Sequence, residues 1–171
     1  MFSTTLCYLE RNRKYLMLHR VKKKADLNEG KWVGIGGKFE EGESPEDCLC
    51  REVKEETGFT LRTWKYRGII TFVSDKSPRG TEFMHLFTSD DFTGEERDCD
   101  EGVAEWIPVE DVMGLNLWAG DRIFLRYLLT DMPFFSLKLV YVGDELTEAV
   151  LNGSKIDAAS AADQSGIRTG S

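Results

Sequence analysis

Short, mainly apolar stretches bounded by polar, turn-forming segments recur along this chain, a pattern that is typical of β-strands. The stretches with strand character are residues 4–9, 15–19, 32–38, 69–74, 83–88, 104–108 and 134–142. Polar segments separate them: turns at 10–13 and 75–80, a loop over 21–31 and an acidic loop over 89–102. Gly36 and Gly37 lie near the end of the third stretch and predict a tight turn where backbones approach closely.

Two other stretches predict helices. The first has Ser44 as an N-cap candidate, Pro45 at the first helical position, Asp47 completing a capping box and Gly58 as a C-cap, so we expect a helix over 45–57. The second, over 121–130, carries apolar residues at the spacing of one buried helical stripe.

Strands interspersed with two main helices favour an α+β fold or a mixed α/β sandwich, with helices on both faces of the sheet. After Asn152 the chain consists mostly of serine, alanine, glycine and aspartate, with little to bury. We therefore expect one domain over 1–152, followed by a flexible tail over 153–171.

The net charge of −8, from 30 acidic and 22 basic residues, argues against stable binding to nucleic acid or to an anionic membrane. The first twenty residues contain no long apolar run, so we expect neither a signal peptide nor a membrane span, and a cytoplasmic protein. The four cysteines show no CxxC spacing, which favours free thiols. Only two histidines are present, so a bound metal would have oxygen ligands, as Mg²⁺ or Mn²⁺ prefers.

The densest charge lies between Gly36 and Phe59, where eight carboxylates accompany three basic side chains. On a helix, Glu52, Glu55 and Glu56 share one face, where their mutual repulsion is unfavourable unless water or a cation intervenes. Two interpretations are open from the helix alone: a solvated surface or a metal-binding face.

The residues around these glutamates follow the spacing G-x5-E-x7-R-E-U-x-E-E-x-G-U, where U is apolar. The matching positions are Gly37, Glu43, Arg51, Glu52, Val53, Glu55, Glu56, Gly58 and Phe59. This motif resembles the Nudix box at every fixed position. The resemblance implies a Nudix α/β/α sandwich with a central mixed sheet, and a divalent-cation-dependent hydrolase of nucleoside diphosphates linked to another moiety.

Segments outside the box resemble the MutT-like branch, which hydrolyses oxidised purine nucleoside triphosphates such as 8-oxo-dGTP. This implies a catalytic and metal-binding set of Gly37, Arg51, Glu52, Glu55, Glu56 and Glu101. It implies a substrate-binding set of Gly36, Gly37, Lys38, Phe72, Trp118 and Asp121. Asp100 is an alternative to Glu101, Trp118 could instead be a core anchor, and Asp121 could cap the following helix. Gly120 stands where animal members of the branch have a second acid.

The function expected from this resemblance is Mg²⁺-dependent conversion of a nucleoside triphosphate to the monophosphate and pyrophosphate, by a monomer or homodimer. Two alternatives remain open. One is a Nudix hydrolase of a dinucleotide polyphosphate, capped RNA or nucleotide sugar; the other is a non-catalytic domain that senses nucleotides.

Overall fold

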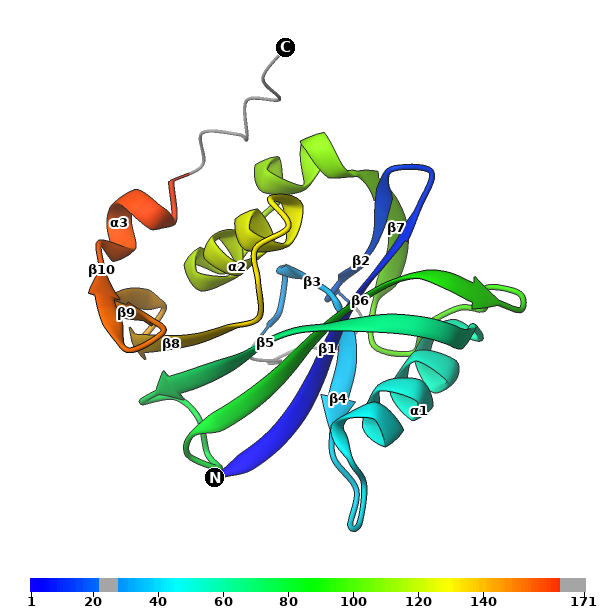
Figure 1. Ribbon diagram of the computed structural model, residues 1–171, viewed down its shortest axis with the longest axis horizontal. Helices are drawn as coiled ribbons and strands as arrows, with labels where there is room; N and C mark the ends of the chain where they lie inside the picture. Colours follow the sequence, from blue (N-terminus) through cyan, green and yellow to red (C-terminus); the bar gives the residue numbers. More distant parts are fainter. Residues whose placement is uncertain (22–27, 164–171) are drawn as a thin grey trace.

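The computed structural model of the protein describes residues 1–21 and 28–163. A curved sheet runs through the molecule, with helix α1 on one side and helix α2 on the other (Figure 1). The strands are β1 (Phe2–Arg11), β2 (Lys14–His19), β3 (Trp32–Val33), β4 (Ile35–Lys38), β5 (Thr60–Ser74), β6 (Glu82–Thr93), β7 (Val103–Pro108), β8 (Phe135–Val142), β9 (Glu145–Leu151) and β10 (Ser154–Ile156). The helices are α1 (Pro45–Thr57), η1 (Val109–Gly114), α2 (Ala119–Leu129) and α3 (Ala158–Ala161).

The strands pair in the order β10-β9-β8-β5-β6-β1-β2-β3, while β4 pairs with β1 and β7 with β2. Strand β1 runs parallel to β6, and β5 runs parallel to β8. The other pairs are antiparallel. The predicted mixed sheet is therefore confirmed.

Each face of the sheet has its own apolar core. Under α1, the buried residues Leu49 and Val53 pack with Cys7 and Phe87 from the sheet. On the other face, residues of α2 such as Phe124 belong to a larger cluster that includes the strand residues of β5 and β8. Burial of both faces explains why the strands read as partly continuous apolar runs, and it confirms the α/β/α sandwich.

The first helix has the ends that the sequence predicts. The Ser44 side chain accepts a hydrogen bond from the backbone N–H of Asp47, while the Asp47 side chain accepts from the Ser44 N–H, each at 3.1 Å. Gly58 ends the helix with a φ of 84°, a left-handed conformation in which a side chain would be strained. Helix α1 is thereby fixed at both ends beside the glutamates.

Several strands differ from the predictions in their limits. The stretch 32–38 divides at Gly34 into β3, which pairs with β2, and β4, which pairs with β1. Strands β5 and β6 are longer than predicted, and β6 extends into the segment expected to be an acidic loop. Their outer halves pair through ladder hydrogen bonds and are mostly exposed, so an apolar pattern could not reveal them.

The segment after residue 142 also differs from the prediction. Strand β9 was not predicted, and β10 and α3 occupy part of the expected flexible tail. Ile156 and Ala158 pack against the larger core, and the Asp157 side chain caps α3, which gives this segment structure despite its small residues. The last part of the predicted tail, 164–171, and most of the predicted loop at 21–31 lie outside the described residues.

All four cysteines are free, as predicted. No helix within residues 1–21 and 28–163 has the length and apolar character needed to cross a membrane.

Candidate functional site

Helix α1 places its glutamates against the glycine backbone of β4. The backbone N–H of Gly36 donates to Glu56 Oε2 at 3.3 Å. A Cβ atom added to Gly37 would lie 2.4 Å from Glu52 Oε1, closer than a real contact allows. The strand can approach the carboxylates this closely because both positions lack a side chain.

Arg51 holds several of these acids in place. Its Nε and Nη2 donate to the two carboxylate oxygens of Glu43, each at 2.8 Å, in a bidentate pair. Its Nη1 donates to Glu52 Oε1 at 2.8 Å and to Glu55 Oε2, one helical turn further on, at 3.2 Å. The hydrogen bonds from Arg51 hold the pKa of Glu43 at about 2, and the same carboxylates raise the pKa of the guanidinium. Glu43 and Arg51 therefore stay ionised as a pair, and Arg51 also orients the side chain of Glu52.

Glu101 joins this group from the segment before β7. It lies against Glu56, and it accepts a hydrogen bond from Arg20 Nη1 at 2.9 Å. Burial, and then the charges of Glu101 and Glu52, raise the pKa of Glu56 to about 9. Asp100, the alternative from sequence, is exposed. The structure thus brings together the acids that the box spacing and the distant loop suggested.

The donor chemistry of this face fits a hard divalent cation. Within the described residues, no three histidine, cysteine, aspartate or glutamate side chains are already positioned as a metal-ligand set. However, Glu52, Glu56 and Glu101 carry only oxygen donors, and burial together with their mutual repulsion raises the pKa of Glu56. A bound cation would relieve that repulsion, so these residues fit the divalent metal that Nudix proteins typically use.

The predicted base-binding residues lie on the other face of the sheet, beside α2. The Tyr141 ring contacts both Phe72, at a centroid distance of 5.1 Å, and Trp118, edge-on at 5.6 Å. Trp118 packs against the larger core, as the core-anchor alternative proposed, and its Nε1 donates to Asn28 Oδ1 at 2.8 Å. Asp121 lies in the first turn of α2, yet this helix has no side-chain cap, so the capping alternative is wrong.

Lys38 is separated from the box glutamates. It pairs with Thr4 across the sheet, and its Nζ lies 6.0 Å from the centre of the Phe2 ring. Only its backbone carbonyl reaches the arginine network, where it accepts from Arg51 at 3.0 Å. The side chain therefore belongs to the α2 side of β4.

Sequence reasoning missed Glu82, at the start of β6. It lies directly opposite Phe72 in the β5–β6 pair, and Thr4 Oγ1 donates to its Oε2 at 2.7 Å. The side chain is largely buried, and burial raises its pKa. A lone glutamate after a turn carries no signal by itself; only the strand register places it beside the aromatic residues.

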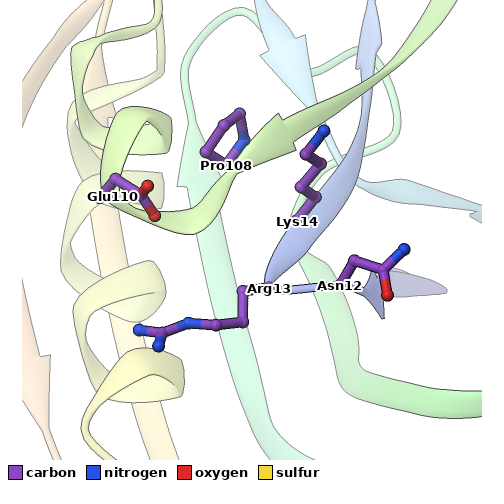
Figure 2. Close-up of a pocket in the computed structure, with 5 residues that line it drawn as sticks. All are labelled: Asn12, Arg13, Lys14, Pro108 and Glu110. Atoms are coloured by element: carbon purple, nitrogen blue, oxygen red, sulfur yellow. The ribbon is translucent and has the colours of Figure 1, made fainter.

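A surface hollow lies elsewhere, between the β1–β2 turn and the start of η1. Figure 2 shows the residues that line it: Asn12, Arg13, Lys14, Pro108 and Glu110. It shares no residue with the glutamate face (Glu52, Glu55, Glu56 and Glu101) or with the aromatic region (Phe72, Trp118 and Tyr141). It therefore does not enlarge either candidate site.

Comparison with known proteins agrees with the geometry. The NUDIX domain family matches residues 2–128. The chain is 33% identical over 128 residues to the uncharacterized Nudix hydrolase YvcI of Bacillus subtilis, covering 73% of this chain and 77% of that protein. It is also 33% identical over 114 residues to an oxidized purine nucleoside triphosphate hydrolase of Danio rerio, covering 66% and 71%. Among solved structures, a MutT protein from Bacillus halodurans superimposes with a TM-score of 0.79 at 27% identity, covering 89% and 98%. The chain therefore belongs to the Nudix hydrolase family.

Proposed function

We propose that this Nudix hydrolase converts a purine nucleoside triphosphate, of the oxidised 8-oxo-dGTP type, to the monophosphate and pyrophosphate with Mg²⁺ or Mn²⁺. The observation that carries the proposal is the crowding of Glu52, Glu56 and Glu101 beside the open backbone of Gly36 and Gly37. An anionic triphosphate needs a cation between itself and these carboxylates.

The glutamates Glu52, Glu55, Glu56 and Glu101, with the Gly37 backbone, would hold the cation. When bound, Mg²⁺ neutralises charge on the phosphoryl oxygens. Arg51 contributes by orienting Glu52 and Glu55 through its ion pairs with them. The glycine backbone leaves room for the phosphates beside these side chains.

The aromatic residues on the α2 side support a purine as the base. Phe72 and Trp118 both contact Tyr141 and have flat apolar rings, and such rings stack on nucleobases. The names of two relatives, the oxidized purine nucleoside triphosphate hydrolases of Danio rerio and Mus musculus, point to the same substrate class.

Steady-state assays test the proposal directly. A panel of 8-oxo-dGTP, dGTP, dATP, a dinucleotide polyphosphate and a nucleotide sugar is incubated with enzyme and Mg²⁺, and the products are identified by chromatography. We expect 8-oxo-dGTP to give the highest kcat/KM and to yield pyrophosphate. Equal turnover of dGTP and 8-oxo-dGTP would refute the preference for an oxidised base, and turnover of only the dinucleotide or the sugar would refute the triphosphate.

Two variants distinguish a catalytic role of Glu55 and Glu56 from a nonspecific effect of negative charge in this stretch. Replacing Glu55 and Glu56 together by glutamine should lower kcat by about 100-fold or more, because several kcal/mol of charge stabilisation depend on the metal ligands. Glu41→Gln, which neutralises an exposed acid of the same stretch, is the matched control and should retain full activity. Undiminished Mg²⁺-dependent turnover in the double variant would contradict the assignment.

A further inference from the structure

Asp121 is a buried acid to which no described residue donates a hydrogen bond. The residue is 9% exposed. The Asp121 oxygens are not fully enclosed, so they are open to a ligand although most of the residue is buried. A ligand group that donates a hydrogen bond to this acid would satisfy it.

Glu82 faces the same space from strand β6. Burial raises the pKa of Asp121 to about 7, and the charge of Glu82 is the next largest cause. One oxygen of Glu82 is already bonded to Thr4, which orients the carboxyl group and leaves the other oxygen for a ligand. The two acids come from different elements, α2 and β6, and they are therefore held by the fold as a whole.

The surroundings of this pair suit a flat, polar-edged ring. Tyr8, whose hydroxyl is fully buried, also lies near Asp121. The Lys31 ammonium covers one face of the Trp118 ring at 4.8 Å from its centre. The charged and titratable groups that face the two acids are Lys31, Lys38, Arg122, Tyr8 and Tyr141.

We propose that Glu82 is a specificity-determining residue, which reads the hydrogen-bonding edge of the purine together with Asp121. This inference rests on the proposed function, since it assumes that a nucleotide base enters the aromatic region. A protonated carboxyl group donates to a carbonyl or ring nitrogen, whereas an ionised one accepts from an amino or ring N–H. Repulsion between neighbouring acids favours the state in which one of them keeps a proton. The protonated carboxyl group then donates a hydrogen bond and the ionised one accepts. This combination matches the carbonyl oxygen and the N–H groups that lie side by side along the base-pairing edge of a guanine-type base.

The test compares Glu82→Gln with a matched control, Glu145→Gln, which neutralises an exposed glutamate at the start of β9. Two substrates are used with Mg²⁺: 8-oxo-dGTP, and the triphosphate of purine deoxyriboside, which lacks every exocyclic group of the edge. Glu82→Gln should raise the KM for 8-oxo-dGTP by about 10- to 100-fold, because a hydrogen bond to a charged group is lost. It should leave kcat, and the KM for purine deoxyriboside triphosphate, within about twofold of the wild-type values. Glu145→Gln should leave kcat and KM for both substrates unchanged.

Equal effects on both triphosphates, or a KM for 8-oxo-dGTP within twofold of the wild type, would overturn the inference. Circular dichroism verifies that the variant is folded. Calorimetric titration with 8-oxo-dGMP in EDTA provides a readout that does not depend on hydrolysis. If the wild type binds 8-oxo-dGMP but cleaves no triphosphate, the proposed function fails, whereas weaker binding by Glu82→Gln still supports the base-reading role. Binding that is absent in the wild type, or unchanged in Glu82→Gln, refutes that role.

Discussion

Replacing Asp121 by asparagine should remove a pH-dependent loss of stability. In the folded protein the pKa of Asp121 is raised to about 7, mainly because the side chain is buried and secondly because Glu82 is near. In the unfolded chain the same group ionises near pH 4. Between these two values the folded state binds more protons than the unfolded state, so the free energy of unfolding falls as the pH rises.

The size of the effect follows from the distance between the two pKa values. A difference of about three pH units corresponds to about 4 kcal/mol, since each unit is worth 1.36 kcal/mol. Part of this loss has already occurred at pH 5, and the loss is complete above pH 7. Asparagine has nearly the shape of the protonated acid and does not ionise. Relative to the wild type, Asp121→Asn should therefore gain about 2–3 kcal/mol between pH 5 and pH 8.

Urea unfolding followed by circular dichroism at pH 5, 6, 7 and 8 measures this gain. Glu145→Gln serves as the control, because its exposed side chain should give a stability difference that does not change with pH. If the difference between Asp121→Asn and the wild type were the same at all four pH values, Asp121 would titrate as an ordinary carboxylate. The description of a buried, unpaired acid, and with it the argument for its interaction with Glu82, would then be wrong.

Three further substitutions test the geometry of the glutamate face. Gly36→Ala places a Cβ atom 1.8 Å from a backbone carbonyl of β1, so urea unfolding should show a loss of more than about 3 kcal/mol, whereas Gly114→Ala, with open space around it, should change stability by less than about 0.5 kcal/mol. In Gly37→Ala the added Cβ atom meets the carboxylate of Glu52, which can rotate away, so the melting temperature should change little. Because Glu52 is then displaced, kcat should fall about tenfold. Unchanged turnover would show that the close approach of Gly37 to Glu52 is unimportant. Arg51→Lys cannot reproduce the bidentate pair with Glu43, and we expect kcat to fall about 100-fold in steady-state assays, with a far-UV spectrum like that of the wild type; a fall below threefold would refute the orienting role.

Much of the glutamate face could be predicted because its determinants are local in sequence. The capping box, Pro45 and Gly58 fix the limits of α1, and helical spacing then decides which glutamates share a face. The contact of Arg51 with Glu55 follows from the same spacing. The bidentate pair with Glu43 does not, because it depends on how the turn before the helix folds back.

The α2 side could be predicted only in part, since its residues come from distant segments. Trp118 and Asp121 are recognisable as a pair near the start of a helix. Glu82, in contrast, reaches them only through the antiparallel register that sets it opposite Phe72, and register is fixed by the whole sheet. The structured segment after Asn152 was missed for a related reason: small residues give no apolar pattern, although they pack well against an existing core.

Glu43 and Asp121 lie on opposite faces of the sheet and have opposite pKa shifts. On the α1 side the Arg51 guanidinium holds Glu43 ionised, with a pKa of about 2, and orients Glu52 through a second hydrogen bond. On the α2 side Lys31 and Arg122 lower the pKa of Asp121 too weakly to offset its burial, and the acid keeps its proton to about pH 7. A nucleotide has the same division, with charged phosphates at one end and a neutral, hydrogen-bonding base at the other. Under the proposed function, the glutamate side would therefore hold the phosphates through a cation, and the α2 side would hold the base.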